Sequence, residues 1–359
     1  MPENTRARTV HPIVNRATLP LATPLRHLAA ALLACAMLAS HAADSEPPPH
    51  LRDTGLGARG VMPFSPQYTL WSDGADKRRW LWLPPGRSID ASNPDAWQFP
   101  PGTRLWKEFA VDGKPVETRY IERRASGRWA YATYVWNADG SDATLAPARG
   151  ASALGGRYSV PSRDDCQACH GSAAVPVLGV GALQLSPERD PLAAHGQLPR
   201  AGDVDLHTLV RRGLVRGLPP ALLATPPRIA ADTPVERAAL GYLHANCGHC
   251  HNGSDNRVPL RLTLAQSVAA PVASRDAALA SLLGAPSRYR PPGLGGAPQV
   301  VSPGQPDSSV LTLRMQSRHP QVQMPPLGTQ VPDTEGSALV HRWIQHDLAP
   351  QPPRKEASP

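Results

Sequence analysis

The sequence predicts an α+β multidomain protein, with a sandwich-like β domain first and helical modules after it. Aromatic and β-branched runs gather in the first half of the chain, where seven of the eight tryptophans lie between Trp71 and Trp136. A clear helix-start signal, Thr233 to Glu236, lies in the second half. Two Cys-x-x-Cys-His motifs, at 166–170 and 247–251, follow the β region. This order of patterns indicates separate β and helical layers.

Residues 1–42 have the pattern of a secretory signal peptide. A short apolar core, Leu28–Leu38, is followed by the small exit segment Ser40-His41-Ala42 and preceded by four basic residues, namely Arg6, Arg8, Arg16 and Arg26. The core is about ten residues long, which is too short to span a bilayer. We therefore expect export and cleavage near Ala42, with the mature protein periplasmic or secreted from a bacterium.

Cysteine usage agrees with export. Four of the five cysteines belong to the two motifs, and the fifth, Cys35, lies in the apolar core of the leader. After cleavage no cysteine remains for a structural disulfide. The segment Leu32–Cys35 loosely fits a lipoprotein cleavage box, and lipidated Cys35 would be the one route to membrane association. The apolar run continues through Leu38, which favours ordinary cleavage.

Charge and composition exclude nucleic-acid binding. The formal charge is +8, and removal of residues 1–42, with four arginines and one glutamate, leaves about +5. No basic stripe with interleaved aromatic residues appears in the sequence. The 42 prolines and 29 glycines predict a chain with many loops.

The predicted β domain covers residues 58–160, after an exposed linker at 43–57. Turns at Asp112-Gly113-Lys114 and Ser126-Gly127 predict hairpins. Both faces of the run Arg128–Asn137 are apolar, so we expect cover on both sides and a β-sandwich. The predicted strands are Arg79–Leu83, Thr103–Val111, Val116–Arg124 and Arg128–Asn137.

Helical modules should follow. We expect residues 161–228 to form a segment that carries the first Cys-x-x-Cys-His motif, with one helix at Asp203–Leu214, and 229–348 to form a second domain. Thr233 to Glu236 makes a capping box, with proline at the first helical position, so a helix should run to Asn246 and deliver Cys247. Further helices are expected near Asp307 and over Asp333–Asp347, and residues 349–359 read as a disordered tail.

The two motifs carry the chemistry. Two thiols three positions apart can add to the two vinyl groups of one porphyrin, and the adjacent histidine can then coordinate its iron. A zinc site or a thioredoxin-like pair is the alternative, but neither explains a histidine repeated in both motifs. We therefore predict two covalently attached haem c groups, whose four propionates would cancel most of the positive charge. The predicted ligands are Cys166, Cys169 and His170 for the first haem and Cys247, Cys250 and His251 for the second.

The second iron needs another axial ligand, and Met324 precedes Pro325-Pro326 just before the last helix. A helix into the motif, irregular loops, a methionine and a closing helix make the order of an all-α class I cytochrome c-like domain. Met324 is therefore the predicted ligand opposite His251, with Met315 as the second choice. For the first iron the candidates are His195, His207, Met62 or an open position.

The sequence resembles the secreted bacterial di-haem c-type cytochrome proteins that carry a β domain before their haem motifs. The resemblance implies a haem protein with a C-terminal cytochrome c domain, and it implies no substrate. The matching stretches are Leu70–Arg79, Phe99–Thr103, Glu117–Arg119, Val160–Arg163, Tyr242–Cys247, Ser302–Gly304, Arg314-Met315 and Met324–Leu327.

Two functions remain open. The first is electron transfer with both irons six-coordinate, through a redox partner that the sequence does not identify. The second is a haem enzyme, peroxidase-like or another oxidoreductase, with an open site at the first haem. A third and weaker alternative is that the tryptophan-rich β domain binds a polymer such as a carbohydrate. Tryptophans on alternating strand positions are better explained as buried core.

Overall fold

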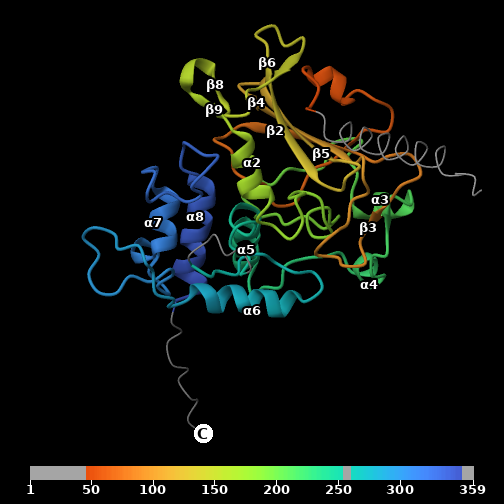
Figure 1. The fold of residues 1–359 in the computed structure, drawn as a ribbon. Helices are drawn as coiled ribbons and strands as arrows, with labels where there is room; N and C mark the ends of the chain where they lie inside the picture. Colours follow the sequence, from red (N-terminus) through yellow and green to blue (C-terminus); the bar gives the residue numbers. More distant parts are fainter. Residues whose placement is uncertain (1–45, 254–259, 350–359) are drawn as a thin grey trace, which may run out of the picture. The chain divides into compact units, whose positions relative to one another are not determined.

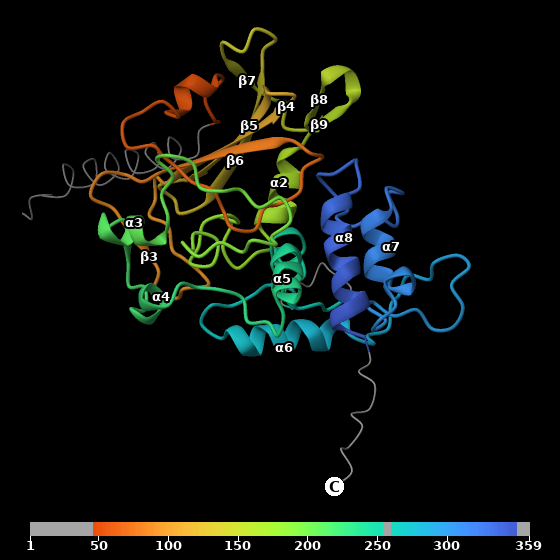
Figure 2. The same ribbon diagram turned by 180° about the vertical axis from the view of Figure 1, so that it is seen from behind.

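A six-stranded antiparallel sheet dominates the N-terminal half of the protein (Figures 1 and 2). The computed structural model describes residues 46–253 and 260–349. The predicted signal peptide, Cys35 and nearly all of the predicted tail lie outside these residues. The strand order is β1-β2-β4-β5-β6-β7. The strands are β1 (Met62–Pro63), β2 (Asp76–Trp82), β4 (Arg104–Val111), β5 (Lys114–Arg123), β6 (Trp129–Trp136) and β7 (Ala143–Leu145).

The two predicted hairpins are confirmed. Strand β4 pairs with β5, and β5 pairs with β6, both antiparallel. At the first turn Asp112 and Gly113 have φ values of 50° and 74°. Positive φ at both central residues is what a tight hairpin with the correct twist requires. The middle of β6 is buried on both faces, as its sequence predicts.

The predicted β-sandwich is wrong, because no second large sheet forms among the described residues. One face of the sheet packs Trp106, Tyr120 and Tyr134 against Leu51, which is 3% exposed. Leu51 belongs to η1 (Leu51–Thr54), within the segment predicted as a linker. The other face is covered by loops and by helix α2 (Arg163–His170). Irregular chain thus covers the apolar strand faces. The remaining strands make two-stranded pairs, namely β3 (Ile89–Asp90) with β10 (Val215–Arg216) and β8 (Ala151–Ala153) with β9 (Tyr158–Val160).

The helices are short and lie mostly after the sheet. Helix α5 (Pro234–Asn246) is as predicted, and Thr233 Oγ1 accepts a hydrogen bond from the Glu236 amide at 3.0 Å. None of the described helices is long and apolar enough to cross a membrane. The others are η2 (Leu154–Gly156), α3 (Leu206–Arg211), α4 (Ala221–Ala224), α6 (Pro271–Leu282), η3 (Pro306–Ser308), α7 (Val310–Gln316), α8 (Thr334–Arg342) and η4 (Trp343–Asp347).

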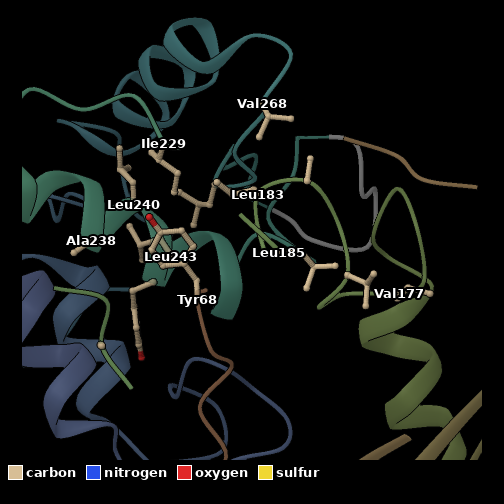
Figure 3. Packing of buried hydrophobic residues seen from close by; sticks show 14 of the residues in the cluster. Tyr68, Val177, Leu183, Leu185, Ile229, Ala238, Leu240, Leu243 and Val268 are labelled. Atoms are coloured by element: carbon tan, nitrogen blue, oxygen red, sulfur yellow. The ribbon is translucent and has the colours of Figure 1, made fainter. Parts of the chain in front are cut away.

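One hydrophobic core joins the sheet region to the helices. Figure 3 shows Tyr68 among Leu240 and Leu243 of α5. A Cβ built on Gly241 would lie only 2.0 Å from the Tyr68 ring, so the ring rests on the bare backbone of this glycine. The same core continues to Leu339 and Trp343 near the C-terminus of the described chain.

The predicted all-α class I cytochrome c-like domain is also wrong. Helices α5, α7 and α8 pack on one another, but segments from the first half of the chain share their core, so they do not form an all-α unit. Tyr68 covers Gly241, and the amide of Trp71 donates to Asn246 Oδ1 at 2.7 Å. Long irregular segments separate the helices. The sequence pattern of helix, motif, methionine and closing helix concerns local elements only. It does not show that segments from the first half of the chain pack between these elements.

Candidate haem-attachment site

Residues of both Cys-x-x-Cys-His motifs line one cavity of about 220 Å³ beneath the sheet, although Cys247 and His251 are not in its described lining. Helix α2 lies between the sheet and α5 in both views (Figures 1 and 2). The cavity lining includes Cys166, Cys169 and His170 from the first motif and His249 and Cys250 from the second. The structure therefore brings together two predicted sites that lie far apart in the sequence.

The first motif is carried by α2, which the sequence analysis did not predict. Ser162 caps this helix, because its Oγ accepts from the Asp165 amide at 3.0 Å while Asp165 accepts from the Ser162 amide at 2.9 Å. Positions three and four apart share one helix face, so Cys166, Cys169 and His170 point to the same side. The helix is short and has no apolar stripe. Its capping box, Ser162-x-x-Asp165, is the signal that identifies it.

His170 has one ring nitrogen engaged by the backbone. Its Nδ1 lies 2.5 Å from the carbonyl oxygen of Pro176, to which it can donate. Metal-ligating histidines commonly donate one ring N–H to a backbone carbonyl, which leaves the other nitrogen for the metal. The ring also contacts Tyr131 of β6, with centroids 5.2 Å apart. Burial lowers the pKa of His170 to about 4, which keeps the imidazole neutral.

The second motif begins where α5 ends. Asn246 closes the helix and ties it to the preceding half of the chain, because its Nδ2 donates to the Thr69 and Tyr242 carbonyls at 3.2 and 3.0 Å. Cys247 follows as the C-terminal cap. Burial raises the pKa of its thiol to about 12. Burial lowers the pKa of His251.

The two motifs touch each other. Cys169 and Cys250 are hydrogen-bond partners, and this contact lowers the pKa of Cys250 and raises that of Cys169. The side-chain amide of Asn252 donates to the Ser172 carbonyl at 2.8 Å just beyond the motifs. All four motif cysteines are free thiols. Groups attached at the two sites would therefore be neighbours.

The candidates for the sixth ligand of the first iron lie elsewhere. His195 Nε2 is 2.8 Å from Asp333 and Nδ1 is 3.2 Å from Glu335, so carboxylates occupy both ring nitrogens. Neither His207 on α3 nor Met62 in β1 belongs to the described lining of the cavity. The structure thus brings none of these three to His170.

Met324 lies next to the cavity without lining it in the described structure. It is half-buried, and its amide donates to the Arg314 carbonyl at 3.0 Å. The residues that follow, Pro325 to Thr329, form part of the cavity wall. Met315 is only 5% exposed in the core, as expected for a packing residue. Ligation by Met324 remains a prediction.

Sequence reasoning missed several nitrogen-bearing side chains in the cavity wall, among them His249 and Lys107. His249 lies between two motif cysteines and cannot reach the haem bound by its own motif, but it faces the cavity that holds His170. Lys107 of β4 lines the same cavity. His249 and His170 share one cavity only because the two motifs approach each other in the fold. No local sequence pattern indicates that approach.

No three His, Cys, Asp or Glu side chains within residues 46–253 and 260–349 converge to hold a metal ion. Comparison with protein-family models, curated proteins and solved structures found no match.

Proposed function

We propose that the chain is an exported di-haem c-type cytochrome that transfers electrons, in line with the family it resembles. One haem attaches at Cys166 and Cys169, and the other at Cys247 and Cys250. The observation that carries the proposal is the meeting of both motifs at one cavity, with Cys169 and Cys250 in contact. Haems held at adjoining motifs would lie close together, as passage of an electron from one to the other requires.

The residues present suit covalent haem. The four thiols are free to form thioethers, and His170 is neutral with Nδ1 engaged by Pro176, which leaves Nε2 for iron. Bound haem supplies reversible one-electron chemistry. His170 and His251 are the proposed proximal ligands, and Met324 is the proposed second ligand opposite His251.

The cavity must open to receive the macrocycles. At about 220 Å³ it is smaller than the roughly 300–1,000 Å³ usual for ligand pockets. Its wall at 325–329 is irregular chain in which Pro326, Leu327 and Gly328 are exposed.

A haem enzyme is the second candidate. It is favoured by the position of His195, His207 and Met62, none of which belongs to the described cavity wall. Without a sixth ligand the first iron would accept a small molecule such as peroxide. Against this, His249 lines the cavity with His170 and offers an imidazole from the second motif.

Optical spectra of the reduced protein, with and without carbon monoxide, separate the two candidates. The electron carrier should show two low-spin haems whose spectrum carbon monoxide does not change. Carbon monoxide binding by the native protein would contradict the carrier and support an enzyme with an open iron.

A further inference from the structure

Three basic side chains form a continuous row across the sheet. Arg79 of β2 pairs directly with Lys107 of β4, and Lys107 pairs directly with Arg119 of β5. Residues directly opposite on antiparallel strands hold their side chains on the same face. Like charges in this arrangement destabilise a sheet, so the row Arg79–Lys107–Arg119, called here the cationic row, calls for a compensating partner.

The cationic row faces the cavity. All three side chains line it, and Arg79 is only 6% exposed. Burial and repulsion from Arg79, Lys77 and Arg119 lower the pKa of Lys107 well below its ordinary value. Three basic side chains have thus been brought into a largely apolar site, where positive charge is costly unless opposite charge or hydrogen bonds are supplied.

The described protein groups leave this charge only partly compensated. Arg119 is paired with Glu117 at 2.6 Å, and Arg79 donates to the neutral amide of Gln197 at 2.8 Å. For Lys107 the described residues provide no hydrogen bond or ion pair, and its Nζ lies 4.8 Å from the Phe109 ring centroid. The one carboxylate in the described cavity wall is Asp165, which caps α2.

The cationic row lies beside the first haem motif. Arg119 pairs across strands with Thr133 of β6. Tyr131, two residues away on the same face of β6, contacts the His170 ring with centroids 5.2 Å apart. Two residues along a strand span about 7 Å, which is within the dimensions of one porphyrin. A group bound through His170 would therefore have its edge within reach of the row.

We propose that the cationic row binds the propionate carboxylates of haem held in this cavity, an inference that rests on the proposed function. Each haem brings two carboxylates, and the row offers two guanidinium forks and one ammonium. Lys107, for which the described residues provide no hydrogen bond or ion pair, is the principal contact. The row then explains why basic residues occupy the buried face of three adjacent strands.

The test is a redox titration of the full-length, haem-loaded protein carrying Lys107→Gln. Loss of a cation beside a propionate favours ferric iron, so the midpoint potential of one haem should fall and that of the other should stay close to wild type. Arg79→Gln is a second variant expected to act in the same direction. Arg78→Gln is the matched control, because Arg78 is exposed on the opposite face of β2 and stacks on Trp80. The control should leave both potentials unchanged.

Other results would overturn the proposal in distinguishable ways. A wild-type protein without covalent haem by mass spectrometry rejects the proposed function and the propionate site together. Two haems with unchanged potentials in both Lys107→Gln and Arg79→Gln reject the propionate site alone. A low-spin to high-spin change in Lys107→Gln would make Lys107 an iron ligand. Saturable binding of succinate or phosphate to the holoprotein, lost in Lys107→Gln, would assign the row to a free anion.

Discussion

Replacing Gly241 by alanine should destabilise the protein, although alanine normally favours a helix. Gly241 lies inside α5, and the new Cβ would be 2.0 Å from Tyr68 Cε1 and 2.4 Å from Cδ1. Tyr68 is 3% exposed, and its hydroxyl donates to Asp190 at 3.1 Å, so the ring has little room to yield. The substitution therefore forces the packing between the sheet half and α5 to shift.

The magnitude follows from three opposing effects. Alanine gains about 1 kcal/mol over glycine in a helix interior. Overpacking a close-packed core costs about 1–3 kcal/mol, and disturbing the Tyr68–Asp190 hydrogen bond costs about 1 kcal/mol more. We expect a net loss of about 1–3 kcal/mol in the free energy of unfolding.

Urea denaturation of the full-length protein, followed by far-UV circular dichroism, measures this loss. Gly57→Ala is the control, because Gly57 is exposed and a Cβ there meets no atom within 4 Å. A Tyr68→Leu/Gly241→Ala double variant should recover part of the loss, since a smaller side chain admits the new methyl group. A Gly241→Ala protein as stable as wild type would show that Tyr68 does not rest on α5.

Three further predictions address the haem ligands and a buried carboxylate. Met324→His should lower the potential of one haem and leave the other nearly unchanged in a redox titration, because a thioether stabilises reduced iron more than imidazole does. We expect His249 to be the sixth ligand of the first iron. His249→Leu should therefore allow carbon monoxide to bind that haem, and the spectrum of the reduced protein should change on addition of carbon monoxide. Asp333→Asn should cost about 2–4 kcal/mol at pH 7. Burial raises the pKa of Asp333, but hydrogen bonds from His195, the Gly336 amide and Tyr242 outweigh it and hold the pKa low. The carboxylate's stabilisation is therefore full above its unfolded pKa of about 3.9 and is lost as the pH falls through the lower folded value. The difference in melting temperature from wild type should shrink towards pH 3.

Secondary-structure elements that depend on interactions between neighbouring residues could be predicted from the sequence. Turn residues such as Asp112-Gly113 predicted the hairpins, and the Thr233 cap predicted the start of α5, because these signals act between neighbours. Helix α2 was missed because cysteines and a histidine occupy the face where an apolar stripe would normally appear. Its signal in the sequence is the capping box that Ser162 forms with Asp165.

The overall architecture could not be read in the same way. Because both faces of β6 are apolar, the sequence correctly predicted that both faces are buried. It did not predict what buries them, because a second sheet and irregular chain can cover an apolar face equally well. The contact of Tyr68 with Gly241 and the approach of Cys169 to Cys250 depend on residues that are far apart in sequence. The cationic row likewise becomes visible only when strand register sets Arg79, Lys107 and Arg119 opposite one another.

The mass of the denatured, exported protein tests covalent haem attachment most directly. We predict a gain equal to two haems over the mature polypeptide. A Cys166→Ala/Cys169→Ala variant should retain one haem, and a Cys247→Ala/Cys250→Ala variant should also retain one. A wild-type protein with the mass of the bare polypeptide, or one that carries zinc in its native state, would contradict the assignment of both motifs.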